Sequence, residues 1–181
     1  MLRVVLVPMV VFALLSEAWV SAFLLFLLAG LSDAVDGIVA RALNQVSEFG
    51  TFLDPIADKA LLVSVFIVLS YLGKVSLWFA ILLVSRDLLI VTGIIIAFLL
   101  DKPITIRPLW ISKATTLIQI VLALLVLELL AFNHTLPTAQ FVVEIIAGVL
   151  TALSGAAYMI QGIRHFAGDA ELKSAVKKGE M

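Results

Sequence analysis

Residues 31–59 decide the fold and read LSDAVDGIVARALNQVSEFGTFLDPIADK. Long apolar segments border this stretch, yet it holds four aspartates: Asp33, Asp36, Asp54 and Asp58. The first two are three residues apart and the last two are four apart, so each pair shares one face of a helix. A turn around Asn44–Ser47 would make these two helices antiparallel neighbours. The four carboxylates can then converge.

The composition of the whole chain favours a membrane protein. Of its 181 residues, 63% are hydrophobic and 14% are charged, and the mean hydropathy is +1.20. A soluble domain has about half apolar and about a quarter charged residues. The net charge of −1 gives no bias toward nucleic acid, so no such partner is expected. Because there is no cysteine, disulfides are excluded and Asp, Glu and His are the plausible metal ligands.

The apolar segments predict an all-α membrane protein with six transmembrane helices. We expect them at Leu2–Leu15, Trp19–Leu43, Gly50–Leu72, Ser76–Leu100, Pro108–Phe132 and Thr138–Arg164. Residues 1–167 then form the membrane domain, and residues 168–181 form a polar cytoplasmic tail. The first apolar run is short for a span of about 20 residues. This suggests a helix that begins before Met1 in the natural protein.

The distribution of basic residues predicts the orientation. An even number of spans puts both termini on one side of the membrane. That side carries most of the lysines and arginines: Arg3, Arg41, Lys102, Arg107, Arg164, Lys173, Lys177 and Lys178. The other side has only Lys74 near a helix end. By the positive-inside rule, both termini are cytoplasmic. We expect an integral protein of a bacterial inner (cell) membrane.

The aspartate cluster needs a physical reason, because a carboxylate inside a membrane costs about 2.5–3.5 kcal/mol even on a lenient scale. Crowded carboxylates also repel one another. Divalent cations solve both problems, and hard cations such as Mg²⁺ bind carboxylates together with substrate phosphates. Two such ions, either Mg²⁺ or Mn²⁺, can clamp a displacement at phosphorus. The alternative is a solvated interfacial loop, which fits poorly with aspartates inside apolar helices.

Small residues and an arginine accompany the aspartates. Gly37 and Ala40 leave room for a bulky ligand against the first helix, and Gly50 does so on the second. Arg41 supplies a fixed positive charge that suits a pyrophosphate. Small residues at helix contacts are also ordinary membrane packing, and that alternative stays open for each of them.

The pattern Asp33-x-x-Asp36-Gly37-x-x-Ala40-Arg41-x8-Gly50-x3-Asp54-x3-Asp58 fixes eight positions within 26 residues. It resembles the signature of the CDP-alcohol phosphotransferases (class I CDP-alcohol phosphatidyltransferases) without a departure. The resemblance implies a homodimeric six-helix enzyme, with residues 1–167 as its catalytic domain. Such an enzyme displaces CMP from a CDP-linked donor, here CDP-diacylglycerol, with an acceptor hydroxyl.

The resemblance also implies roles for individual residues. Asp33, Asp36 and Asp54 match the positions that hold the metal pair. Asp58 matches the proposed general base, which also touches a metal. The nucleotide-binding positions include the first two aspartates and four further residues: Gly37, Ala40, Arg41 and Gly50.

The second half of the chain should select the acceptor. Arg86 and Lys113 are candidates to bind an anionic group, and Arg107 and Arg164 could add to that pocket. The alternatives are an Arg86–Asp87 pair that only fixes helix packing, a Lys113 side chain that snorkels to the interface, and arginines that anchor the helices.

Two further segments bear on the identity of the acceptor. Ser85-Arg86-Asp87 and Ser112-Lys113-x-x-Thr116-x-x-Gln119 resemble the branch of phosphatidylglycerophosphate synthases and eukaryotic-type cardiolipin synthases. This predicts glycerol-3-phosphate as acceptor, with phosphatidylglycerol as the alternative. A cation transporter or channel is the alternative of another class, although its charges would more often line a path across the bilayer. A structural subunit would leave the aspartates unexplained.

Overall fold

The computed structural model describes residues 2–43, 48–99 and 110–179, and within these ranges the secondary structure consists of α-helices joined by turns. Side chains at 2–4, 33–43, 48–58, 94, 97, 98 and 163–179 lie outside what it describes. The described chain forms six helices: α1 (Leu2–Leu15), α2 (Trp19–Leu43), α3 (Glu48–Tyr71), α4 (Leu77–Leu99), α5 (Trp110–Ala131) and α6 (Pro137–Gly179). The predicted all-α class is confirmed over these ranges, and α1 and α2 have the predicted bounds.

Three helices end in the same kind of turn. The residues after α1, α3 and α5 that adopt a left-handed backbone are Glu17, Gly73 and Asn133, with φ angles of 53°, 67° and 53°. In each turn the next amide reaches back five residues, as from Lys74 N to Leu69 O at 2.8 Å. This is the Schellman arrangement, which satisfies carbonyls at a helix C-terminus. It confirms three of the breaks that the sequence predicts.

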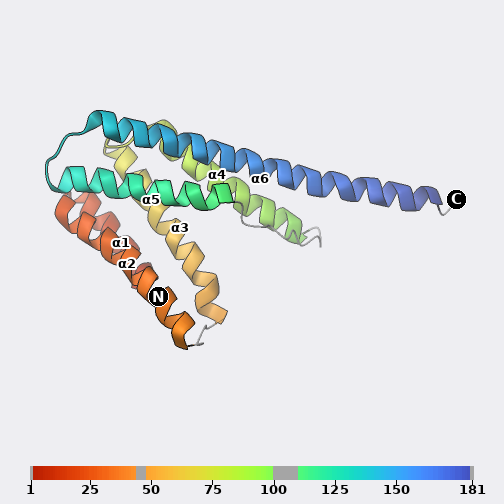
Figure 1. Cartoon of the computed structure of the whole chain (residues 1–181), viewed down its shortest axis with the longest axis horizontal. Coiled ribbons are helices and arrows are strands. Elements are labelled where there is room, and N and C mark those ends of the chain that lie inside the picture. The colour runs from red at the N-terminus through yellow and green to blue at the C-terminus, as the bar shows by residue number, and fades with distance from the viewer. Residues whose placement is uncertain (1, 44–47, 100–109, 180–181) are drawn as a thin grey trace.

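These turns gather at one end of the molecule (Figure 1). α1 packs on α2 and α3, α4 packs on α3 and α6, and α5 packs on α2, α3 and α6. Away from this end the helices diverge: α2 and α3 run toward the 44–47 connection, and α4 and α6 run in another direction (Figure 1). The aspartate-bearing ends of α2 and α3 therefore lie opposite the three turns.

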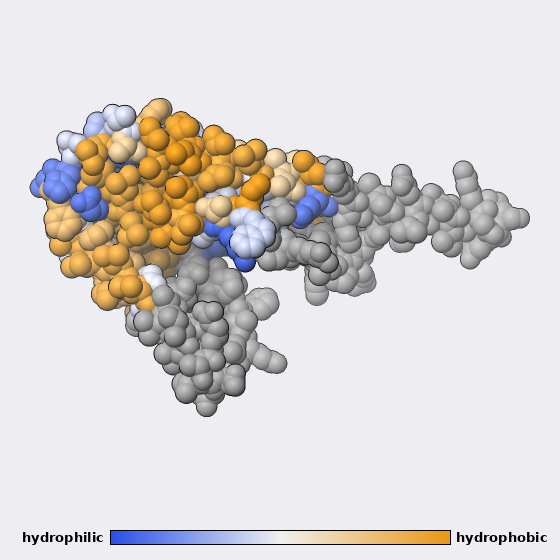
Figure 2. All heavy atoms as spheres, viewed as in Figure 1, coloured by the Kyte–Doolittle hydropathy of each residue, from blue (hydrophilic) through white to orange (hydrophobic). Residues whose placement is uncertain are grey.

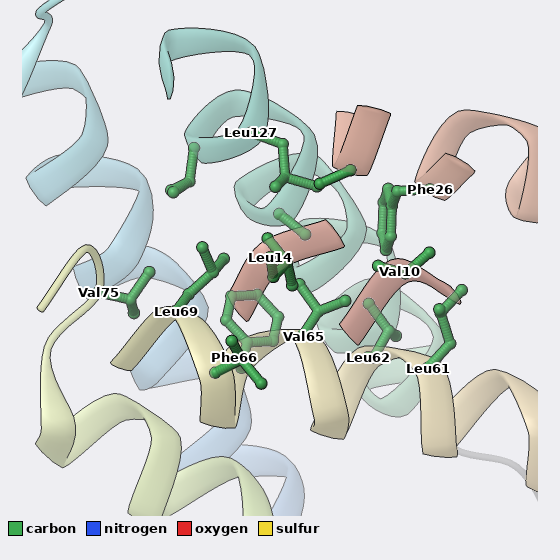
Figure 3. Packing of buried hydrophobic residues seen from close by; sticks show 14 of the residues in the cluster. Val10, Leu14, Phe26, Leu61, Leu62, Val65, Phe66, Leu69, Val75 and Leu127 are labelled. Atoms are coloured by element: carbon green, nitrogen blue, oxygen red, sulfur yellow. The ribbon is translucent and has the colours of Figure 1, made fainter. Parts of the chain in front are cut away.

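The core lies where α1 and α2 pack on α3 and α5 (Figure 3). Val10 and Leu14 of α1 are fully buried, as are Val65 and Phe66 of α3. The Phe66 ring meets the Phe79 ring of α4 edge to face, with centroids 5.1 Å apart. This contact fixes the C-terminal half of α3 to the N-terminal half of α4.

The described part of the face shown in Figure 2 is mostly apolar, and many large hydrophobic side chains are exposed. On α2, an exposed stripe runs along one side of the helix at helical spacing: Val20, Leu24, Leu28 and Leu31. Soluble monomers rarely expose so large an apolar area, whereas a bilayer accommodates it. Within the described residues, Trp110–Ala131 and Pro137–Gly162 are long and apolar enough to cross a membrane. Three shorter apolar helical segments are Val5–Leu15, Trp19–Ser32 and Lys59–Tyr71.

α6 differs from its predicted bounds. It continues past Arg164 to Gly179, with no break between residues 167 and 168. With 43 residues its axis is about 64 Å long at the ordinary helical rise, and it extends beyond the bundle (Figure 1). The prediction followed the loss of hydropathy after residue 164. Residues 169–178 are rich in Ala, Glu, Lys and Leu, which favour helix without any apolar periodicity.

Candidate active site

The motif residues occupy two helices that flank one connection. Asp33 and Asp36 lie in the last part of α2, and Asp54 and Asp58 lie in the first part of α3. Because both helices are continuous there, the predicted helical spacing within each pair holds at the backbone level. The side chains of all eight motif residues lie outside the described set, so their convergence remains a prediction. Among the described side chains, no group of three or more acids and histidines could hold a metal.

Arg86 of α4 is the centre of the best-described polar cluster. Its side chain is only 6% exposed. Nη1 donates to Asp87 Oδ1 at 2.6 Å, while Nη2 donates to Ser112 Oγ at 2.8 Å and to Ser154 Oγ at 2.9 Å. The guanidinium carbon also lies 5.7 Å from the centre of the Tyr158 ring. One side chain thus joins α4 to α5 and α6.

One nitrogen of the Arg86 guanidinium has no described hydrogen-bond partner. Nε of Arg86 is buried, and no described residue accepts a hydrogen bond from it. The close fit continues on α6, where a Cβ at Gly155 would lie 3.5 Å from Arg86 Cγ, which is ordinary contact. The alternative in which Arg86 and Asp87 fix helix packing therefore accounts for the contacts of Arg86 with α5 and α6.

Asp87 also reaches α3. Lys59, the residue after Asp58, donates from Nζ to Asp87 Oδ1 at 2.7 Å. Asp87 is 20% exposed and Lys59 is 45% exposed. The same carboxylate oxygen therefore accepts hydrogen bonds from a lysine of the aspartate-bearing helix α3 and from an arginine of its own helix. Lys59 is not among the site residues that the sequence predicts, although its place beside Asp58 is a signal.

The remaining acceptor candidates are not drawn into this cluster by any described contact. Lys113 is exposed and lies over the Trp110 ring, with Nζ 5.2 Å from the centroid. Its neighbour Ser112 contacts Arg86, so the two cations lie near the same part of α5. Arg107 and the side chain of Arg164 lie outside the described residues.

A polar seam continues from Arg86 between α5 and α6. Thr115 Oγ1 shares its proton between Ile111 O of its own helix at 2.8 Å and Leu150 O of α6 at 3.1 Å. Gln119 Nε2 donates to Thr151 Oγ1 at 3.0 Å. All three side chains, Thr115, Gln119 and Thr151, are buried. Hydrogen bonds of this kind hold helices together within membranes. Gln119, which the sequence analysis grouped with the acceptor motif, therefore packs two helices.

Two surface hollows, of about 320 and 300 Å³, lie at the opposite end of the molecule. Both are lined by Lys74, in the turn before α4, and by Pro137 and Gln140, in the first turn of α6. Gln140 Nε2 donates to Lys74 O at 2.6 Å, which ties these turns together. Because the motif residues lie at the other ends of α2 and α3, these hollows are not part of the candidate site.

Comparison with known proteins gives the family. Residues 1–154 match the family model described as CDP-alcohol phosphatidyltransferase, and this range contains all eight motif positions. The chain belongs to the CDP-alcohol phosphatidyltransferase family. This family is membrane-associated, which agrees with the apolar surface and the two candidate spans.

Relatives include both kinds of enzyme that the sequence analysis named. A probable phosphatidylglycerophosphate synthase of Mycobacterium tuberculosis is 34% identical, with 93% of this chain and 81% of the relative covered. A CDP-diacylglycerol–glycerol-3-phosphate 3-phosphatidyltransferase of Aquifex aeolicus is 32% identical, with 90% and 92% covered. The CMP-forming cardiolipin synthase of Rattus norvegicus is 31% identical, with 74% and 50% covered. Family membership leaves the transporter alternative without support.

Proposed function

We propose that this protein transfers a phosphatidyl group from CDP-diacylglycerol to glycerol-3-phosphate and releases CMP. The observation that carries the proposal is the family match over residues 1–154, which contains the complete motif. The choice of acceptor rests on the relatives. The two named for glycerol-3-phosphate or phosphatidylglycerophosphate are covered over 92% and 81% of their length, against 50% for the rat cardiolipin synthase.

In this proposal two divalent cations, Mg²⁺ or Mn²⁺, are held by Asp33, Asp36, Asp54 and Asp58. The donor set fits, because these are hard oxygen ligands without any cysteine. When bound, the ions neutralise the donor pyrophosphate and the departing CMP. Gly37, Ala40 and Gly50 leave room for the nucleotide, and Arg41 pairs with its phosphates.

The chemistry assigned to the protein's own groups is a single displacement. Asp58 accepts the proton of the acceptor hydroxyl. The hydroxyl oxygen attacks the phosphorus that bears diacylglycerol, and the bond from that phosphorus to the bridging oxygen breaks. CMP leaves with the bridging oxygen. The reaction needs no oxidant or reductant.

The acceptor would bind on the side of α4, α5 and α6. Lys113 is exposed and free to reach a phosphate. Arg86 adds a fixed charge, and its buried Nε–H gains a partner if an acceptor oxygen lies beside it, which removes the cost of an unpaired donor. Arg107 and Arg164 are proposed to complete this pocket. The site would lie near the cytoplasmic interface, where CMP can leave and lipid chains remain in the bilayer.

The finer points of architecture belong to this proposal as well. We place all six helices across a bacterial inner membrane, with both termini cytoplasmic, and we expect a homodimer. Residues 1–167 would be the catalytic domain. The continuous α6 would carry the polar tail of residues 168–181 away from the bilayer.

Purified protein in lipid or detergent, given CDP-diacylglycerol and a panel of acceptors, tests the function. We expect phosphatidylglycerophosphate and CMP with glycerol-3-phosphate, identified by product mass. The rat relative supports the second candidate, in which phosphatidylglycerol is converted to cardiolipin. If glycerol-3-phosphate is ignored and cardiolipin appears, the first choice of acceptor fails. Failure to release CMP from CDP-diacylglycerol with either acceptor would contradict both.

A further inference from the structure

A continuous chain of polar contacts links the aspartate-bearing helix to the acceptor side. Lys59 Nζ of α3 and Arg86 Nη1 of α4 meet on one oxygen, Asp87 Oδ1, at 2.7 and 2.6 Å. From the same guanidinium, Nη2 reaches Ser112 of α5 and Ser154 of α6. Two cationic side chains and the carboxylate between them thus connect four helices.

The Lys59–Asp87 contact holds a distinctive position in this series of polar contacts. Among the described side chains, Lys59–Asp87 is the one hydrogen bond between α3 and any of α4, α5 and α6. The apolar contact between Phe66 and Phe79 lies two turns further from the motif. Beyond Lys59, toward Asp58 and Asp54, α3 runs away from α4 and α6 (Figure 1). Lys59 is therefore the last described tie before the motif.

We propose that Lys59 and Asp87 are positioning residues that hold the motif half of α3 at a fixed place relative to α4–α6. This inference rests on the proposed function, since it concerns metal ligands on one side and acceptor charges on the other. A tie at the residue next to Asp58 restricts both the rotation and the distance of that helix end. Such restriction matters because a misplacement of about 1 Å can cost about 100-fold in rate.

The pair is poorly suited to a purely stabilising role. Lys59 is 45% exposed, and exposed ion pairs contribute little to the free energy of folding. A structural tie would therefore show small effects everywhere. A positioning tie would show a small effect on the melting temperature and a large one on turnover and on metal affinity.

A double-mutant cycle on the full-length protein separates these roles, with Lys59→Met, Asp87→Asn and the combination. For Lys59→Met we expect kcat to fall about 10- to 100-fold, the range seen when the support of a metal ligand is lost. Mn²⁺ binding, followed by electron paramagnetic resonance without substrate, should weaken by a similar factor. The KM for each substrate should stay within about twofold, and Lys59→Arg should restore most of the loss, because it keeps the charge.

The cycle adds a second criterion. If the pair acts as a unit, the double variant should be no worse than Asp87→Asn alone, since the contact is already broken. The matched control is Lys74→Met, which removes a cation that lies over Trp19 at the other end of the molecule. It should leave both kcat and Mn²⁺ affinity unchanged.

Three results would overturn the proposal. The first is a Lys59→Met protein with turnover and Mn²⁺ affinity within twofold of the wild type. The second is a double variant whose losses multiply. The third is a fall in melting temperature that accounts for the lost activity. If the wild type itself transfers no phosphatidyl group, the proposed function fails separately, and the Mn²⁺ titrations still decide whether Lys59 and Asp87 act on the motif.

Discussion

The indole of Trp78 lies against the backbone of Gly148, so that a Cβ built on this glycine would stand 2.6 Å from Trp78 Cη2. The contact joins α4 to α6. One turn further along α4, Leu82 lies 3.9 Å from the same point, and Arg86 lies beside Gly155. Two glycines of α6 that are seven residues apart thus pack against two α4 residues, Trp78 and Arg86, that are eight residues apart. Small residues at such helix contacts allow close approach within a membrane.

This contact predicts opposite signs for two glycine substitutions. Gly148→Ala forces the Trp78 ring to move, and overpacking of this kind costs about 1–3 kcal/mol. Gly162→Ala places its Cβ where no described atom lies within 4 Å, so the gain in helix propensity, about 1 kcal/mol, should dominate. Thermal unfolding in detergent measures both. Trp78→Leu should relieve Gly148→Ala, and equal destabilisation by the two alanines would contradict the packing account.

Removal of the motif carboxylates should separate folding from chemistry. Asp33→Asn, Asp36→Asn and Asp54→Asn keep the side-chain shape but lose the charge that binds a divalent cation. We expect each to lose transfer by more than the roughly 10- to 100-fold that loss of a residue supporting a ligand costs. The protein should remain inserted and folded. Glu128→Gln, at an exposed carboxylate paired with His134, is the control. Near-normal turnover in two of the three variants would end the metal assignment.

Much of the fold follows from the sequence, but the contacts between helices do not. Hydropathy places α1 and α2 at their observed bounds, and glycine or polar residues mark the turns at Glu17, Gly73 and Asn133. The predicted end of the last helix, Arg164, is wrong, since α6 continues to Gly179. A polar, helix-favouring segment has no apolar period that would predict this continuation.

The candidate site divides in the same way. The Asp motif follows from spacing along the chain, and its side-chain geometry lies outside the described residues. Arg86 could be named because it is an arginine inside an apolar segment. Its partners Ser112 and Ser154, and the approach of Lys59 to Asp87, depend on the relative rotation of four helices. No periodicity within one helix reports that rotation.

The two cations proposed for the acceptor should respond differently to substitution. Arg86 is buried and donates hydrogen bonds to Asp87, Ser112 and Ser154. Loss of one partner of a buried ion pair costs about 3–5 kcal/mol of folding free energy. We expect Arg86→Ala to fall at the lower end of that range, because Asp87 still accepts a hydrogen bond from Lys59. Lys113 is exposed, so Lys113→Ala should change stability by less than about 0.5 kcal/mol.

Kinetics then test the role of Lys113 without a folding defect. Lys113→Ala should raise the KM for glycerol-3-phosphate far more than that for CDP-diacylglycerol, since a charge-assisted hydrogen bond is worth about 1.5–3 kcal/mol. Lys74→Ala is the matched control at the other end of the molecule. An unchanged KM for glycerol-3-phosphate would limit Lys113 to its contact with Trp110.

The orientation of the helices can be measured directly, because the chain has no native cysteine. Ser16 and Thr135 are exposed in turns at the end that we place outside, and Lys178 belongs to the basic end of α6. The bias of lysine and arginine predicts that an impermeant maleimide labels Ser16→Cys and Thr135→Cys on intact cells, and Lys178→Cys only after lysis. Labelling of Lys178→Cys on intact cells would invert the topology. Different labelling of the two turn positions would mean that α2–α5 do not cross the membrane an even number of times.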